Sequence, residues 1–296
     1  MSGISYSRWN KIVGWSVFGI GLLTYGLTVE PTASYWDCAE YIATSAKLQV
    51  GHPPGAPLFQ MLGAFFALFA TSQEQIALTV NFMSVFSSAF TLLFMFWTLT
   101  LLLRKLPLFE EIKTPQEALL FFGSAAIGVL AYCFSDSFWF NAVEAEVYAM
   151  ATFLLSLLFW LGLRWEQDML NPRGDRWLIM IAFVIGLSIG VHFMGLLTIP
   201  AIGMLYYFKH YKEVTLKGFV IANAVSVAIL LFIFKLLLPT TLGFFGKAEV
   251  YFVNNIGLPF NSGTIIAALT LVALFYYGLK RPVNKVGSNS IQPCFV

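Results

Sequence analysis

Long stretches without charge recur along this chain, and they limit what it can fold into more than any other feature. Residues 76–103, for example, contain no Asp, Glu, Lys or Arg. A helix needs about 20 apolar residues to cross the hydrocarbon core of a bilayer. Inside the bilayer the backbone N–H and C=O groups must find partners within the protein, which a helix provides. We therefore predict an all-α, polytopic membrane protein.

Eight membrane spans are predicted from the spacing of these stretches. Hydrophobic residues make up 58% of the chain and charged residues 11%, whereas a soluble domain has about 25% charged residues. The spans are expected near residues 11–28, 76–103, 118–134, 143–163, 177–191, 193–208, 217–238 and 263–279. Residues 1–285 are then one transmembrane module, and residues 286–296 form a polar tail.

The basic residues indicate how these spans are oriented. Fourteen Lys and Arg residues fall on one side of the predicted spans, and only Lys47 and Lys247 fall on the other. Because cytoplasmic loops are enriched in Lys and Arg, the N-terminus is predicted to be cytoplasmic. Loops 29–75, 135–142 and 239–262 are then outside. The basic residues are spread over short loops, so no nucleic-acid partner is expected.

The first outer loop combines charged residues with helix and turn signals. Residues 36–49 are predicted to form an amphipathic helix, and its polar face carries Asp37, Glu40, Thr44 and Lys47. The segment that follows, Gly51 to Pro54, contains His52 and two prolines, which favour an extended turn. Residues 57–70 are predicted to form a second, apolar helix that is too short to span. Both helices are expected to lie along the membrane surface.

A second acidic pair, Glu144 and Glu146, is predicted at the outer end of a span. In a helix, Asn141, Glu144 and Tyr148 share one face, because they are separated by three and four residues. Glu146 lies on another face. Glu144 is therefore expected to face the site, and Glu146 is the second candidate. Since both acidic clusters fall on the outer side, we expect them to belong to one site.

These residues resemble a known superfamily of membrane enzymes. A span followed by an outer loop with an early Asp, an amphipathic helix and a Pro-Pro turn is similar to the GT-C glycosyltransferases. More narrowly, Asp37 and Glu40, the segment Gly51 to Leu58 and the segment Asn141 to Tyr148 resemble a family related to the protein O-mannosyltransferases. The resemblance implies transfer of a mannose-like sugar from a polyprenyl phosphate to an acceptor hydroxyl, such as Ser or Thr of an exported protein.

The resemblance also assigns roles within the first loop. Asp37 matches the catalytic carboxylate of the superfamily and is expected to be the base. Glu40, one helical turn away, is expected to make Asp37 more basic through like-charge repulsion. His52 is expected to contact the phosphate or the sugar.

The other candidate site residues are assigned to substrate binding, and they are Glu144, Glu146, Asn141, Tyr148, Lys47 and His192. An oxygen-rich carboxylate cluster suits Mg²⁺ or Mn²⁺, so a divalent metal stays an open alternative. The relatives do not need a metal, so neither a metal nor another cofactor is expected. The expected partners are a lipid-linked sugar, a protein or glycan acceptor and membrane lipid. A partner chain or a soluble C-terminal domain is expected to help bind the acceptor. The resemblance favours a bacterial inner membrane, with the site on the periplasmic face.

Other readings of the same residues stay open at this point. Asp37 is at the position of a helix-capping residue, so capping is one alternative. Glu144 and Glu146 are at the position of an ordinary solvated helix end. An isolated histidine such as His192 is often structural. A lipid or small-molecule transporter would also place polar groups between spans, but no inverted repeat is evident. A non-catalytic membrane subunit is the remaining alternative.

Overall fold

The computed structural model describes residues 5–109, 112–171 and 174–280. Within these ranges the protein consists of helices and contains no strand, which confirms the all-α prediction. The polar tail predicted over residues 286–296 lies outside the described residues. The chain divides into two compact units, one up to Leu230 and one from Leu231 onward. A single module over residues 1–285 stays a prediction.

The first unit contains most of the helices. They are α1 (Tyr6–Leu27), α2 (Cys38–Ala46), α3 (Pro57–Ala67), α4 (Ile76–Leu103), α5 (Pro115–Cys133), α6 (Asp136–Ala142), α7 (Val147–Asp168), α8 (Asp175–Ile189), the 3-10 helix η3 (Phe193–Leu197), α9 (Thr198–His210) and most of α10 (Leu216–Phe232). The second unit contains α11 (Leu238–Val250) and α12 (Ser262–Lys280), with π-helical turns at Ile233–Leu237 and Tyr251–Asn255.

Four helical segments of the described chain are long and apolar enough to cross a membrane. They are Gln73–Leu103, Pro115–Cys133, Val147–Asp168 and Leu216–Asn255. The chain is therefore an integral membrane protein. The predicted number of eight spans is not confirmed, because α8 and α9 have only 15 and 13 residues.

The last of these segments corrects the sequence prediction. A span was expected to end near residue 238, followed by an outer loop over residues 239–262, but the helical segment continues to Asn255. Pro239 would normally interrupt a helix, because it lacks an N–H and its ring clashes with the preceding turn. Here it follows the π-helical turn Ile233–Leu237, where the hydrogen-bond pattern has already changed. Residues 239–255 are therefore helical, and their place outside the membrane stays a prediction.

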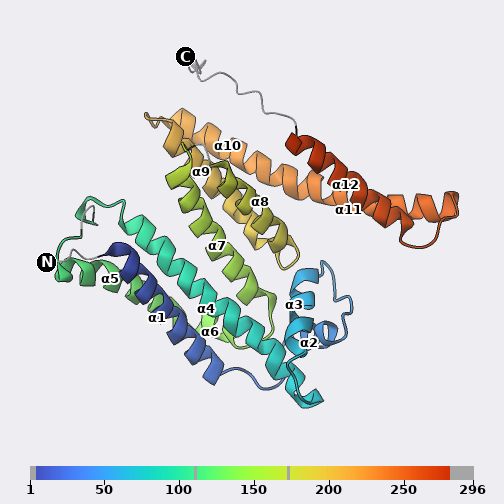
Figure 1. Cartoon of the computed structure of the whole chain (residues 1–296), viewed down its shortest axis with the longest axis horizontal. Helices are drawn as coiled ribbons and strands as arrows, with labels where there is room; N and C mark the ends of the chain where they lie inside the picture. Colours follow the sequence, from blue (N-terminus) through green and yellow to red (C-terminus); the bar gives the residue numbers. More distant parts are fainter. Residues whose placement is uncertain (1–4, 110–111, 172–173, 281–296) are drawn as a thin grey trace. The chain divides into compact units, whose positions relative to one another are not determined.

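Helix α4 is the central element of the first unit. It packs against α1 and α5 and also against α3 and α7 (Figure 1). Its Val80 and Met83 belong to an apolar cluster shared with α2, α3, α7 and α8. Its Leu92 and Phe96 belong to a second cluster shared with α1, α5 and α6. Because α4 contributes to both cores, the first outer loop and the α6–α7 connection both pack against this one helix.

The two predicted surface helices are present but shorter than expected. Helix α2 spans Cys38–Ala46 instead of 36–49, and α3 spans Pro57–Ala67 instead of 57–70. The polar face of α2 does not simply project away from the membrane, because Thr44 is buried and accepts a hydrogen bond from Gln60 Nε2 at 3.0 Å. This face therefore packs against the segment that contains His52 and the start of α3.

Candidate functional site

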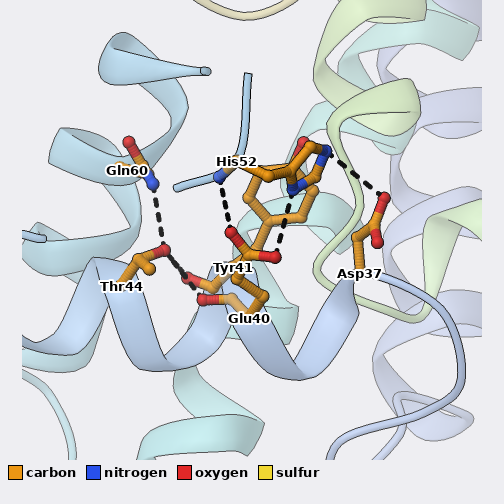
Figure 2. A network of polar contacts seen from close by, with 6 residues as sticks. All are labelled: Asp37, Glu40, Tyr41, Thr44, His52 and Gln60. Carbon is orange, nitrogen blue, oxygen red and sulfur yellow. Dashed lines mark hydrogen bonds and ion pairs between the residues drawn. The ribbon is translucent and has the colours of Figure 1, made fainter. Parts of the chain in front are cut away.

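Asp37, Glu40 and His52 lie together at the N-terminal end of α2, as Figure 2 shows. The backbone N–H of His52 donates to Glu40 Oε1 at 2.6 Å, and its Nδ1 lies 3.1 Å from Glu40 Oε2. The other ring nitrogen, Nε2, lies 3.7 Å from Asp37 Oδ2. The side chains of Asp37 and His52 are 53% and 41% exposed, so this cluster is open to a substrate.

Local backbone geometry brings these groups together. Trp36, directly before Asp37, has a φ of 60°, which turns the chain sharply into α2. Gly51 lies so close to α2 that a Cβ there would be 2.8 Å from Gln60 Nε2 and 3.2 Å from Glu40 Oε1. A larger residue here would require the ends of the Gln60 and Glu40 side chains to move, so glycine suits the close approach of His52 to Glu40.

The second acidic pair does not lie on a helix. Helix α6 ends at Ala142 and α7 begins at Val147, and Glu146 between them is extended, with φ −112° and ψ 147°. The prediction that Asn141, Glu144 and Tyr148 share one helical face is therefore wrong, as is a span that begins at residue 143. Nor is this a solvated helix end, because Glu144 and Glu146 are buried, with 4% and 6% exposure.

Asn81, on α4, explains why the helix is interrupted here. Its side-chain amide donates to the carbonyl oxygens of Glu30 and Thr32, and its Oδ1 accepts from the N–H of Ala145 at 2.9 Å. The N–H of Glu30 also donates to the carbonyl oxygen of Val143. These bonds occupy backbone groups that a helix through residues 143–146 would need. Sequence analysis missed Asn81, although a polar residue inside a predicted span is itself a signal.

The two buried glutamates have different neighbours. The hydroxyl of Ser34 donates to Glu144 Oε2, so Glu144 faces the start of the first loop. Glu146 lies near Asp37, close enough for the charge of Asp37 to raise the pKa of its carboxyl group. Sequence analysis favoured Glu144 as the residue that faces the site, but the structure places Glu146 beside Asp37.

These environments shift the pKa values of the acidic residues. Burial, followed by the negative charge of Asp37, raises the pKa of Glu146 to about 7. Burial also raises the pKa of Glu144, and the bond from Ser34 opposes that rise. In contrast, hydrogen bonds from His52 lower the pKa of Glu40, and the same contact raises the pKa of His52. Sequence analysis expected Glu40 to act on Asp37, but its main partner is His52.

Aromatic rings line the region around these carboxyl groups. The ring of Tyr41 on α2 lies 6.0 Å from that of His52, and burial followed by the charge of Glu146 raises the pKa of Tyr41 to about 12. The ring of Tyr148, in the first turn of α7, lies 5.5 Å from that of His192. His192 Nδ1 accepts a hydrogen bond from the N–H of Met194, and burial lowers the pKa of the imidazole.

Two predicted site residues are not joined to this cluster by any described contact. Lys47 is exposed at the end of α2 opposite Asp37. The side-chain amide of Asn141 donates to the carbonyl oxygen of Ser137, within α6. The site brought together by the fold therefore consists of Asp37, Glu40, Tyr41, His52, Glu146, Tyr148 and His192. Such a site offers carboxylates, an imidazole and aromatic faces to a polar substrate.

Comparison with known proteins identifies the family of this chain. The family described as the N-terminal domain of the protein O-mannosyl-transferase TMEM260 matches residues 37–215, which include all seven residues of the site. The chain belongs to this family. This agrees with the resemblance to proteins related to the O-mannosyltransferases that the sequence motifs indicated.

Two curated relatives carry the same name. The protein O-mannosyl-transferase tmem260 of Dictyostelium discoideum is 24% identical over 141 residues, which cover 47% of this chain and 15% of that protein. The protein O-mannosyl-transferase TMEM260 of Mus musculus is 27% identical over 178 residues, which cover 59% of this chain and 22% of that protein. The chain thus aligns with less than a quarter of either relative. No solved structure matches it.

Proposed function

We propose that this chain is a membrane glycosyltransferase that moves a mannose-like sugar from a polyprenyl phosphate to an acceptor hydroxyl. The acceptor class is Ser or Thr of exported protein, and the reaction takes place at the outer face of a bacterial inner membrane. One observation carries the proposal: the family match covers the whole cluster of Asp37, Glu40, His52 and Glu146. The relatives in that family are named O-mannosyl-transferases.

Asp37 is the base in this proposal. Its carboxylate takes the proton of the acceptor hydroxyl while the acceptor oxygen forms a bond to the anomeric carbon. The bond from that carbon to the phosphate oxygen breaks, and the lipid phosphate leaves with the electron pair. Asp37 suits this role because its carboxylate is half exposed beside a buried carboxyl group and a histidine. Attack from the face opposite the phosphate inverts the anomeric centre.

The neighbours of Asp37 position the reactants. His52 is held by two contacts to Glu40, so its Nε2 remains directed toward Asp37 and toward the space in front of it. In this position it is able to donate to a phosphate or sugar oxygen. Tyr41 and Tyr148 offer ring surfaces to the sugar, while Glu146 is available to bind a hydroxyl.

The proposal is tested with the full chain purified in detergent and a radiolabelled polyprenyl-phosphate mannose as donor. A Ser/Thr-rich peptide serves as acceptor, and transfer of label to the peptide is measured. Asp37→Asn is expected to reduce transfer by about 100- to 10,000-fold, because the amide is not a base. The matched control is Asp136→Asn, which changes an exposed carboxylate in the first turn of α6. It is expected to keep wild-type transfer.

Each outcome has a distinct meaning. Loss of transfer in an Asp37→Asn protein that melts like the wild type supports both the activity and the base. Equal transfer by the two proteins rules out Asp37 as the base but keeps the glycosyltransferase. Binding of the labelled lipid without transfer from any donor would overturn the proposed activity and favour a lipid transporter or a non-catalytic subunit.

A further inference from the structure

The ligand-type atoms of Asp37, Glu40 and His52 are arranged closely enough to surround one metal ion. A carboxylate oxygen from each acidic residue and one imidazole nitrogen all lie within 4.8 Å of one another. Donors that bind an octahedral ion at about 2.1 Å lie about 3 Å apart on adjacent corners and about 4 Å apart on opposite corners. The three donor atoms therefore need to move only slightly to bind one ion together.

Glu146 supplies an independent observation that points to a ligand. This residue is 6% exposed, and its Oε1 is buried without a hydrogen-bond partner among the described residues. Its carboxyl group lies near the same cluster, because the charge of Asp37 raises the pKa of Glu146 and the charge of Glu146 raises the pKa of His52. A buried carboxylate oxygen without a partner is costly, and a bound cation removes that cost.

The charges of the site also favour a cation. Three carboxyl groups meet here, and among the described residues their only cationic partner is His52. No described lysine or arginine forms an ion pair with them. A phosphate donor would add further negative charge to this site. The half-exposed side chains of Asp37 and His52 leave a path by which an ion enters.

We propose that Asp37, Glu40 and His52 bind a divalent cation of the Mn²⁺ class, with Glu146 as a further carboxylate ligand. Carboxylate oxygens suit Mg²⁺ and Mn²⁺, and the single imidazole favours Mn²⁺ over Mg²⁺. The ion would bind one ring nitrogen of His52, in place of a proton on that nitrogen. The sequence left a divalent metal possible, and none was expected because the relatives that the chain resembles do not need one.

The role of the ion follows from the proposed function and rests on it, whereas binding of the ion does not. When bound, the cation neutralises the charge that develops on the departing lipid phosphate. Asp37 keeps a second carboxylate oxygen for the acceptor hydroxyl.

Binding is measured on the full chain in detergent, after treatment with a chelator, by the electron paramagnetic resonance signal of free Mn²⁺. The wild type is expected to bind one Mn²⁺ per chain. Glu40→Gln is expected to weaken the affinity by about 10- to 100-fold or more, and Asp136→Asn to leave it unchanged. Absence of saturable binding by the wild type, or equal binding by a folded Glu40→Gln protein, would overturn the proposal.

Two further measurements separate a metal site from a merely structural cluster. Electron spin echo modulation of bound Mn²⁺ is expected to show coupling to one imidazole nitrogen, which disappears in His52→Gln. Glu146→Gln is expected to weaken Mn²⁺ binding, whereas a carboxyl group that only carries a proton would tolerate this change. Thermal melting checks that each variant is folded.

The metal proposal and the proposed function fail in different ways. Sugar transfer that continues unchanged in excess chelator would overturn the proposed role of the ion in transfer and leave the transferase. Saturable Mn²⁺ binding by a protein that transfers no sugar would overturn the proposed transferase activity and support the metal site.

Discussion

Single buried polar residues decide the arrangement of this site. Asn81 is fully buried on α4 and joins the backbone at Glu30 and Thr32 to that at Ala145. Hydrogen bonds that satisfy buried backbone groups contribute about 1 kcal/mol each, and leaving such groups unpaired costs about 1–3 kcal/mol. The three bonds of Asn81 therefore hold the start of the first loop and the acidic segment in one position, from which Glu146 reaches Asp37.

His192 gives the folded protein a predictable response to pH. Burial lowers its pKa below the value of about 6.5 that it has when unfolded. As the pH falls below about 6.5, the unfolded chain takes up a proton that the folded protein does not. The free energy of unfolding therefore decreases until the pH reaches the pKa of His192 in the folded protein. Relative to a protein without a titrating group at this position, we expect the wild-type melting temperature to decrease between about pH 8 and pH 5.

The control for this prediction is His192→Asn, which keeps a side-chain acceptor for the N–H of Met194 but does not titrate. Its melting temperature is expected to fall less over the same range, as measured by intrinsic tryptophan fluorescence in detergent. Parallel curves for the two proteins would show that His192 does not contribute.

At the level of elements, contacts between helix ends position the site. The carbonyl oxygen of Gly190, at the end of α8, accepts from the N–H of Leu58 at 2.8 Å, in the first turn of α3. The first N–H groups of a helix have no partner within that helix, so this contact satisfies a group that would otherwise be unpaired. It also fixes the turn that carries His192 against the helix that follows the His52 loop.

Two glycines of α8 offer a matched test of this contact. A Cβ at Gly190 would lie 2.9 Å from Leu58 Cβ, whereas a Cβ at Gly186 would meet nothing within 4 Å. Gly186→Ala is expected to stabilise the protein by about 0.5–1 kcal/mol, since alanine favours a helix over glycine. Gly190→Ala is expected to lower the melting temperature and the rate of sugar transfer, because α3 must move. Equal melting temperatures for the two variants would contradict this account.

At the level of the whole molecule, ion pairs join the ends of the helices far from the site. Lys105 after α4 and Lys209 on α9 both contact Glu166 near the end of α7, at 2.7 and 3.2 Å. Arg176 at the start of α8 lies 3.7 Å from Asp168. The structure therefore gathers these basic residues at one end of the first unit, as the sequence layout required. The positive-inside rule predicts that this end is cytoplasmic.

This orientation is tested by labelling single cysteines with a membrane-impermeant maleimide. The three native cysteines are replaced by serine, and a cysteine is introduced at Gln49 or at Lys212, both exposed. In intact cells, Gln49→Cys is expected to react and Lys212→Cys to react only after the membrane is permeabilised. The reverse pattern would place Asp37 on the cytoplasmic side and exclude exported proteins as acceptors.

Features that depend on neighbours along the chain could be predicted from the sequence. Apolar stretches predicted a helical membrane protein, and the spacing of Asp37, Glu40 and His52 predicted that they lie together, because one helical turn and one proline turn suffice to join them. Only the tertiary structure decided that Glu146, and not Glu144, faces Asp37. Residues 143–146 were predicted to be helical, yet bonds from Asn81 and Glu30 occupy backbone groups there, and the segment interrupts the helix between α6 and α7. Those partners are more than 60 residues away along the chain, so no local periodicity predicts them.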